Sequence, residues 1–197
     1  DKENERRDQR KKRRAITWED CHRLVETTKA NNKTRACMSA QARAMLYKVA
    51  FRTLLRARAL RELTVADCNL SGPSPFLAIR AETDKTGRAR AVPLPRELAH
   101  ELAEMIGTRK ATATIWNIPP SIAKAMRRDL LDAGIPFKTV EGECDFHALR
   151  HSGATHMAKA GVSLDIVAKV GGWTSLTQFF SRYGHYSISH LTDAVAK

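Results

Sequence analysis

The sequence lacks any long apolar run. No stretch approaches the length of a membrane span, and no charged segment followed by an apolar one resembles a secretion leader. It also has no glycine-rich phosphate loop, and its four cysteines form no C-x-x-C pair and have no histidine at metal-ligand spacing. These absences argue against a membrane protein, a P-loop ATPase and a zinc-held domain. We expect reduced thiols, in a cytoplasmic protein, at Cys21, Cys37, Cys68 and Cys144.

Basic side chains are abundant. The chain has 34 lysines and arginines against 21 acidic residues, a formal net charge of +13. The first fourteen residues hold eight basic and four acidic side chains, which leaves +9 for the rest of the chain. A folded body this basic is typical of a protein that lies on nucleic-acid phosphates. A surface tuned only for solubility is the alternative interpretation.

The N-terminal segment differs in composition from the rest. Residues 1–14 contain no apolar side chain, so they cannot bury surface to offset their chain entropy. They are predicted to be a basic disordered linker, and residues 15–197 a single folded domain. Thr17 can cap a first helix, and a second helix is expected from Ser39, where apolar residues recur at helical spacing.

A β-hairpin is predicted to interrupt the helices. Residues 71–75 are rich in Gly and Pro, and residues 76–82 and 88–94 have the pattern of two strands about a turn at 85–87. The predicted fold class is therefore mainly α with a small antiparallel β element, an α+β domain. Further helices are expected after Pro95, after Ser121 and from Phe146 onward.

The most informative segment is F-H-A-L-R-H at residues 146–151. His147 and Arg150 are three positions apart and share one helix face, so a proton-transfer group and a guanidinium can point at one anion. His151 lies on the same face, either as a supporting residue or as a simple helix stabiliser. An isolated H-x-x-R pair is usually a surface or capping pair, so its weight depends on the motifs that accompany it.

Several short motifs accompany it in a meaningful order. H-A-L-R-H, then G-G-W at 171–173 and R-Y-G-H at 182–185, resemble the C-terminal signature of the tyrosine recombinases, or phage integrases. K-T-G followed by basic residues and V-P-L, at 85–94, is similar to the hairpin on which this family carries its catalytic lysine. Residues 53–56 resemble the segment with the family's first catalytic arginine. The resemblance covers about Arg14 to Lys197.

The resemblance implies the tyrosine-recombinase catalytic fold and the cutting and rejoining of DNA through a 3′-phosphotyrosyl link. Two arginines would clamp the phosphate, a lysine would protonate the leaving 5′-oxygen, and a tyrosine would be the nucleophile. A histidine would assist loss of the tyrosine proton, and a tryptophan would donate its indole N–H to the phosphate. Such chemistry needs no ATP, metal or other cofactor. The implied catalytic residues are Arg56, Lys85, His147, Arg150, Trp173 and Tyr183.

Two departures concern the first arginine. The glycine that usually precedes it in T-G-L-R is Leu54, and the acidic residue usually three positions after it is Ala59. Arg58 therefore remains a rival to Arg56.

A third departure concerns the nucleophile. The interval from Trp173 to Tyr183 is one residue longer than the family's common spacing, which puts Arg182 where the tyrosine normally falls. A bulge or loop would have to correct the register. Tyr186 is the alternative nucleophile, but the Y-G-H sequence at Tyr183 favours Tyr183.

The resemblance also implies partners. Double-stranded DNA is the expected substrate, and the family has a separate N-terminal core-binding domain, apparently absent from this chain, which residues 1–14 would join to the catalytic domain. Relatives assemble as tetramers on DNA, whereas this chain alone is expected to be a monomer that binds DNA weakly and salt-sensitively. Apolar residues after the tyrosine could dock onto a neighbouring subunit or fold back onto their own domain. These residues are Ile188, Leu191 and Val195.

Three other functions remain open from the sequence. A type IB topoisomerase uses similar Arg, Lys, His and Tyr chemistry, although the H-A-L-R-H, G-G-W and V-P-L context favours an integrase. A catalytically silent DNA-binding module would result if the shifted register left Tyr183 out of reach. A helical protein-interaction domain would have to match five motifs in order by chance.

Overall fold

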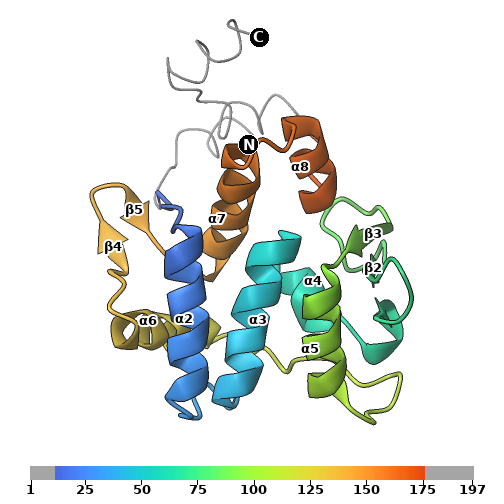
Figure 1. The fold of residues 1–197 in the computed structure, drawn as a ribbon, viewed down its shortest axis with the longest axis horizontal. Coiled ribbons are helices and arrows are strands. Elements are labelled where there is room, and N and C mark those ends of the chain that lie inside the picture. The colour runs from blue at the N-terminus through green and yellow to red at the C-terminus, as the bar shows by residue number, and fades with distance from the viewer. Residues whose placement is uncertain (1–11, 176–197) are drawn as a thin grey trace, which may run out of the picture.

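The computed structural model describes residues 12–175. Its centre is formed by helices α2 (Trp18–Ala30), α3 (Ala40–Thr53) and α7 (Phe146–Lys159), with α3 packed against both others (Figure 1). The two predicted helix starts are confirmed. The Thr17 hydroxyl accepts a hydrogen bond from the Asp20 amide at 3.1 Å, and the Ser39 hydroxyl accepts one from the Ala42 amide at 3.1 Å. Such caps satisfy backbone donors that a helix leaves unpaired at its N-terminus.

The contact between α3 and α7 determines where the candidate site lies. Gly153 of α7 has no room for a side chain, because a Cβ there would lie 1.9 Å from the Phe51 carbonyl oxygen and 2.6 Å from the Leu54 side chain. The absence of a Cβ lets α7 cross close to the C-terminal end of α3. The segment that follows α3 is thus held against α7.

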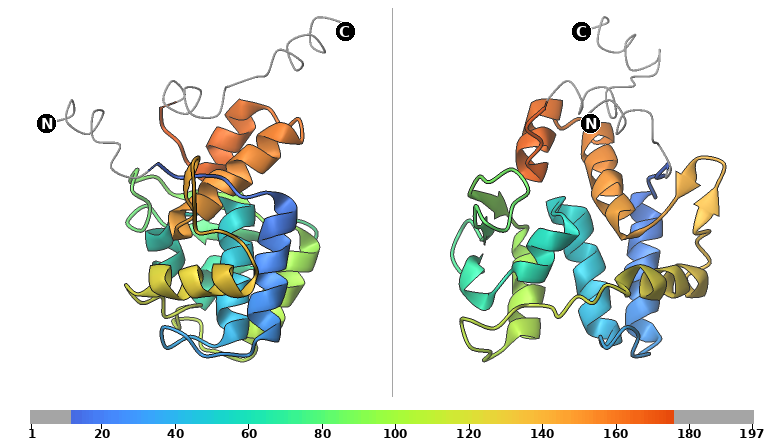
Figure 2. Two further views of the ribbon diagram at one scale, coloured as in Figure 1. Left: turned by 90° about the vertical axis from the view of Figure 1, so that its left-hand side faces the viewer. Right: turned by 180° about the vertical axis from the view of Figure 1, so that it is seen from behind.

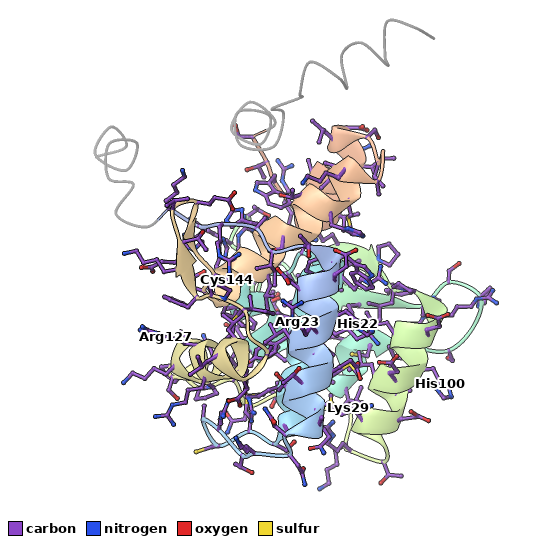
Figure 3. The ribbon with its side chains drawn as sticks, turned by 60° about the vertical axis from the view of Figure 1, so that its left-hand side comes forward. His22, Arg23, Lys29, His100, Arg127 and Cys144 are labelled. Carbon is purple, nitrogen blue, oxygen red and sulfur yellow. The ribbon has the colours of Figure 1, made fainter. Side chains whose placement is uncertain are left out.

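Two further helices cover the sides of this core. Helix α5 (Arg96–Ile106) follows Pro95 and packs beside α3, while α6 (Ile122–Asp132) follows Ser121 and runs across α2 (Figure 1). Arg23 of α2 and Arg127 of α6 lie on these neighbouring helices (Figure 3). The Arg23 side chain donates to the Ala133 carbonyl at 3.0 Å, just after α6 ends.

The predicted β-hairpin is confirmed, with shorter strands than expected. The strands β1 (Cys68–Asn69), β2 (Phe76–Ile79) and β3 (Arg90–Pro93) form an antiparallel sheet in that order. Leu77 of β2 pairs with Val92 of β3, and both are fully buried, which fixes the register because a slip by one residue would expose them. Short helix α4 (Ala57–Glu62) and the 3₁₀ turn η1 (Val65–Asp67) lead into this sheet.

A second small sheet was missing from the sequence prediction. The strands β4 (Lys138–Thr139) and β5 (Gly142–Glu143) pair antiparallel, and the backbone of residues 12–14 lies against β5. The Glu143 amide donates to the Lys12 carbonyl at 2.8 Å, and the Arg14 amide donates to the Glu143 carbonyl at 3.2 Å. Residues 12–14 of the expected linker therefore belong to the folded domain. Backbone pairing and side-chain ion pairs hold them, without the apolar burial that the prediction required.

Helix α8 (Leu164–Gly171) completes the described structure. It packs on α7, and its apolar side shares a small core with Leu54 and Ala154. Figure 2 shows α8 next to the β2–β3 hairpin, on the side of the domain away from β4 and β5. The mainly α fold with small antiparallel sheets agrees with the predicted class. Within residues 12–175 no helix is long and apolar enough to span a membrane.

Candidate active site

Arg56 lies directly after an unusual backbone turn. Leu54, the residue after α3, has a φ of 57° and a ψ of 22°, in the left-handed region that favours glycine. This is the position where the motif leads us to expect glycine. A non-glycine residue in this conformation costs about 1–2 kcal/mol, which the complete burial of the Leu54 side chain offsets. The left-handed turn redirects the chain, so that Arg56 precedes α4.

Lys85 lies in the turn between β2 and β3 and shares a small pocket with Arg56. Asp84, just before it, accepts hydrogen bonds from the Thr86 amide at 2.9 Å and from Arg90 Nε at 3.0 Å. The Arg56 guanidinium lies 3.6 Å from Asp84 Oδ1. Burial lowers the pKa of Arg56, and the Asp84 carboxylate opposes that change. With a carboxylate so near, Arg56 remains a cation in the neutral pH range.

His147 occupies the first turn of α7. Asp145 caps this helix, since its Oδ1 accepts a hydrogen bond from the Ala148 amide at 3.0 Å, and it also pairs with Arg13 at 2.9 Å. Burial, together with the positive charges of Arg13 and Arg150, lowers the pKa of His147 to about 4, against the opposing charge of Asp145. The imidazole is therefore neutral at pH 7. It can accept a proton or a hydrogen bond there.

Arg150 connects α7 to two other segments. Its side chain is almost fully buried, and its Nη1 donates to the Leu54 carbonyl and, at 2.8 Å, to the Gly171 carbonyl. The Trp173 ring covers the guanidinium, with 3.7 Å between Arg150 Cζ and the ring centroid, in a cation–π contact. A Cβ at Gly171 would lie 1.8 Å from the Trp173 ring, so glycine is required for this stacking.

The described candidate residues lie near one another but form two groups. Arg56 and Lys85 line the same pocket, whereas His147, Arg150 and Trp173 do not line it. The groups are nevertheless connected, because Arg150 binds the Leu54 carbonyl, two residues before Arg56, and the charge of Arg56 contributes to the lowered pKa of His147. Tyr183 lies outside the described residues.

The neighbouring candidates occupy different surroundings. Arg58 also touches the pocket, but its side chain is 62% exposed and pairs with Glu62 at 3.1 Å, whereas the Arg56 side chain is 25% exposed. The ring of His151 meets the ring of His147 edge-on, with 5.0 Å between centroids. Tyr186, the alternative nucleophile, lies outside the described residues, as do the apolar residues expected to follow the nucleophile.

Three polar residues at the site were not singled out by sequence reasoning. Asp84 had a local signal, since an Asp two residues before Thr86 is typical of an Asx-turn. Asp145 had another, because an Asp just before a helix is a common N-cap. Arg90 had none. Its partners, besides Asp84, are the carbonyls of Val170 at 2.6 Å and Gly171 at 3.3 Å, about eighty residues away in the chain.

Comparisons with known protein sequences point in one direction. The chain is 29% identical to the tyrosine recombinase XerA of Pyrococcus horikoshii over 155 residues, which cover 73% of this chain and 50% of that protein. It is 40% identical to the integrase of Salmonella phage P22 over 48 residues, 24% of this chain and 12% of the integrase. The chain thus spans about half the length of the Pyrococcus protein that it matches.

Solved structures agree on the fold. The XerH site-specific recombinase in a pre-cleavage complex with its difH substrate matches 94% of this chain and 54% of its own, with a TM-score of 0.71 and 22% identity. The catalytic domain of bacteriophage HP1 integrase matches 92% of this chain and 93% of its own, with a TM-score of 0.65 and 20% identity. The profile of the phage integrase family matches residues 14–190. This match covers nearly all of the described domain, and the chain belongs to the phage integrase family.

Proposed function

We propose that this chain is the catalytic domain of a site-specific DNA recombinase that cleaves and rejoins DNA through a covalent bond to Tyr183. The observation that carries the proposal is the gathering of Arg56, Lys85, His147 and Arg150 from three distant parts of the sequence. Membership of the phage integrase family and the likeness to a recombinase bound to its DNA support it.

The arginines suit a phosphate that is under attack. A DNA phosphodiester resists nucleophiles because its oxygens are negatively charged, and its transition state concentrates charge on two non-bridging oxygens. The Arg56 side chain lines the pocket, and its guanidinium lies 3.6 Å from the Asp84 carboxylate, beyond hydrogen-bonding distance. Arg150 would supply a second guanidinium once DNA binding moves the Trp173 ring or draws the arginine toward the pocket.

Each proton transfer has a suitable group. Tyr183 would attack phosphorus and lose its proton, which the neutral imidazole of His147 can accept. The bond from phosphorus to the 5′-oxygen then breaks, and Lys85, exposed in its turn, would give that oxygen a proton. The 3′-phosphotyrosyl bond preserves the energy of the broken phosphodiester, so rejoining needs no ATP.

The DNA partner and the assembly follow from the same proposal. The basic chain would contact double-stranded DNA mainly through phosphates, so its affinity should fall steeply with salt. As in relatives, strand exchange would require several catalytic domains on two duplexes, with the segment before residue 12 leading to a core-binding domain. The segment with Ile188, Leu191 and Val195 would dock onto a neighbouring subunit or fold back onto its own domain, and this chain alone would be monomeric.

Covalent trapping tests the proposal directly. The protein and a Tyr183→Phe variant are incubated with a randomised pool of nicked duplexes, in which the short cleaved strand diffuses away and prevents rejoining. We expect a protein–DNA adduct that survives boiling in detergent for the parent protein and none for the variant. The sequence of the trapped DNA then supplies a defined substrate.

The other outcomes separate the alternatives. An adduct that persists in Tyr183→Phe would make Tyr186 the nucleophile. Binding to duplex DNA without an adduct from either protein would overturn the proposal in favour of a silent DNA-binding module. If the adduct forms as expected, relaxation of a supercoiled plasmid without strand exchange would identify a topoisomerase instead of a recombinase.

A further inference from the structure

A single buried carboxylate lies between two arginines at the edge of the pocket. The Asp84 side chain is 2% exposed, and its Oδ2 accepts from Arg90 Nε at 3.0 Å while its Oδ1 faces Arg56 at 3.6 Å. Oδ1 also accepts from the Thr86 amide at 2.9 Å and from the Thr86 hydroxyl at 3.1 Å. Asp84 therefore sets the shape of the turn that carries Lys85 and, through charge, the place of Arg56.

Arg90 extends this arrangement to the end of α8. Its Nη1 donates to the Val170 carbonyl at 2.6 Å and its Nη2 to the Gly171 carbonyl at 3.3 Å. Gly172 is packed against the guanidinium, because a Cβ at that residue would lie 2.7 Å from Arg90 Nε. The Gly171 carbonyl also accepts from Arg150 at 2.8 Å. One carbonyl is thus shared by the arginine of the hairpin and the arginine of α7.

The absence of an acid at position 59 of α4 makes this arrangement more important. Position 59, one turn after Arg56, is a buried alanine. Among the described residues Asp84 is the carboxylate that forms an ion pair with Arg56. Without it, Arg56 and Arg90 would face each other as like charges in a partly buried place, and each would repel the other.

We infer that Asp84 and Arg90 are positioning residues that align Arg56, the Lys85 turn and the Gly171 carbonyl bound by Arg150 as one unit. The inference rests on the proposed function, because it concerns the geometry of that reaction. Asp84 keeps the general acid Lys85 correctly placed relative to the phosphate-binding Arg56. Arg90 keeps both correctly placed relative to the Val170 and Gly171 carbonyls that it binds.

Removing only the charge of Asp84 tests this. Asp84→Asn keeps the side-chain shape and an oxygen for the Thr86 amide, but loses the ion pairs with both arginines. Arg90→Lys keeps the charge but cannot reach Asp84, Val170 and Gly171 together. Glu82→Gln is the matched control, because Glu82 belongs to the same hairpin, is 67% exposed and pairs only loosely with Arg80 at 3.5 Å.

The readout separates positioning from folding and from DNA affinity. We expect both variants to melt within a few degrees of the parent and to bind the trapped duplex about equally well, but to cleave it at least tenfold more slowly. A duplex with sulfur in place of the 5′-bridging oxygen should restore much of the rate, because a thiolate leaves without a proton from Lys85. Glu82→Gln should cleave at the parent rate.

Each remaining outcome decides a specific point. A parent-like cleavage rate in Asp84→Asn and Arg90→Lys would overturn this inference while leaving the proposed function intact. Slow cleavage that the sulfur substrate does not restore would show that Lys85 is not displaced, and would also overturn it. Failure of the parent protein itself to form an adduct would overturn the proposed function, and the inference with it.

Discussion

Two clusters of arginine and aspartate in this domain use the same chemistry for different ends. In the scaffold cluster, Asp129 of α6 accepts from Arg43 at 2.8 Å, from Tyr47 at 2.8 Å and from Arg35 at 2.6 Å. The Arg43 side chain is fully buried, and its remaining Nη1 donates to two backbone carbonyls. Each charged side chain in this cluster is therefore paired with another group of the protein.

The pocket cluster, made of Arg56, Asp84 and Arg90, is less complete. Asp84 is as buried as Asp129, but it is shared by two arginines, and one of them is 3.6 Å away and 25% exposed. That distance is beyond a hydrogen bond, so charge attraction alone holds Arg56 to its carboxylate. A fully paired arginine therefore stabilises a fold, while a partly paired one remains able to bind an anion.

The largest expected effect comes from breaking the scaffold cluster. Asp129→Ala leaves Arg43 buried without its carboxylate, which should lower the free energy of unfolding by about 3–5 kcal/mol. Urea titration followed by circular dichroism measures the change. Asp132→Ala is the control, because Asp132 also pairs with Arg35 at 2.6 Å but is 23% exposed, so a loss of about 1 kcal/mol or less is expected. Equal losses of unfolding free energy in Asp129→Ala and Asp132→Ala would show that the buried ion pair stabilises the fold no more than the partly exposed one.

In the pocket cluster, a substitution is expected to change the cleavage rate strongly and the stability little. Arg56→Lys keeps the charge but loses the planar guanidinium, and cleavage of the trapped duplex should slow by about 10²–10³-fold. Stability should change by only about 0.5 kcal/mol, as for an ordinary surface substitution. The measurements are single-turnover cleavage and urea titration. Arg58→Lys should leave the cleavage rate and the stability unchanged. A larger drop in cleavage rate in Arg58→Lys than in Arg56→Lys would make Arg58 the catalytic arginine instead of Arg56.

Substitution of Leu54 alters the backbone turn before Arg56 without removing a charged side chain. Leu54→Ala should lower the free energy of unfolding by about 2–5 kcal/mol, because it leaves a cavity between α7 and α8. Leu54→Gly removes at least as many atoms but relieves the left-handed strain, so it should be about 1 kcal/mol less destabilising than Leu54→Ala. Thermal melts of the pair give the difference. A glycine variant that is less stable than the alanine variant would mean that strain is negligible at this turn.

Acid should act on His147, a candidate residue that belongs to neither cluster. Because the folded-state pKa of His147 is lowered to about 4, below the ordinary value of about 6.5, the unfolded chain takes up a proton before the folded one does. Stability is therefore lost as the pH falls from about 6.5 to about 4. The loss should be about 1–2 kcal/mol after allowing for screening of the partly exposed ring.

His147→Gln removes this titration, and its unfolding free energy should depend less on pH in that window than that of the parent. Urea titrations at several pH values measure the difference. Identical pH dependence in parent and variant would show that the imidazole is not held in its neutral form.

Local features of the sequence were good predictors of the elements. Caps at Thr17 and Ser39 satisfy donors within one turn, and the hairpin follows from strand propensity on either side of a short turn. The β4–β5 sheet and its pairing with residues 12–14 were missed, because two-residue strands have no periodicity and the segment that pairs with β5 lies about 130 residues away in the chain. The described site residues followed from short motifs in the order typical of the family.

The family, the main helices, the hairpin and the candidate catalytic side chains could be predicted from the sequence, because helix caps, apolar periodicity and catalytic motifs are local patterns. Tertiary packing accounts for the left-handed turn at Leu54, for the ion pair between Asp84 and Arg56, and for the Gly171 carbonyl that Arg90 and Arg150 share. Those contacts join a guanidinium to a backbone carbonyl or to a distant carboxylate. Backbone carbonyls are the same at every residue, so no pattern of side chains along the chain reveals which one an arginine will reach.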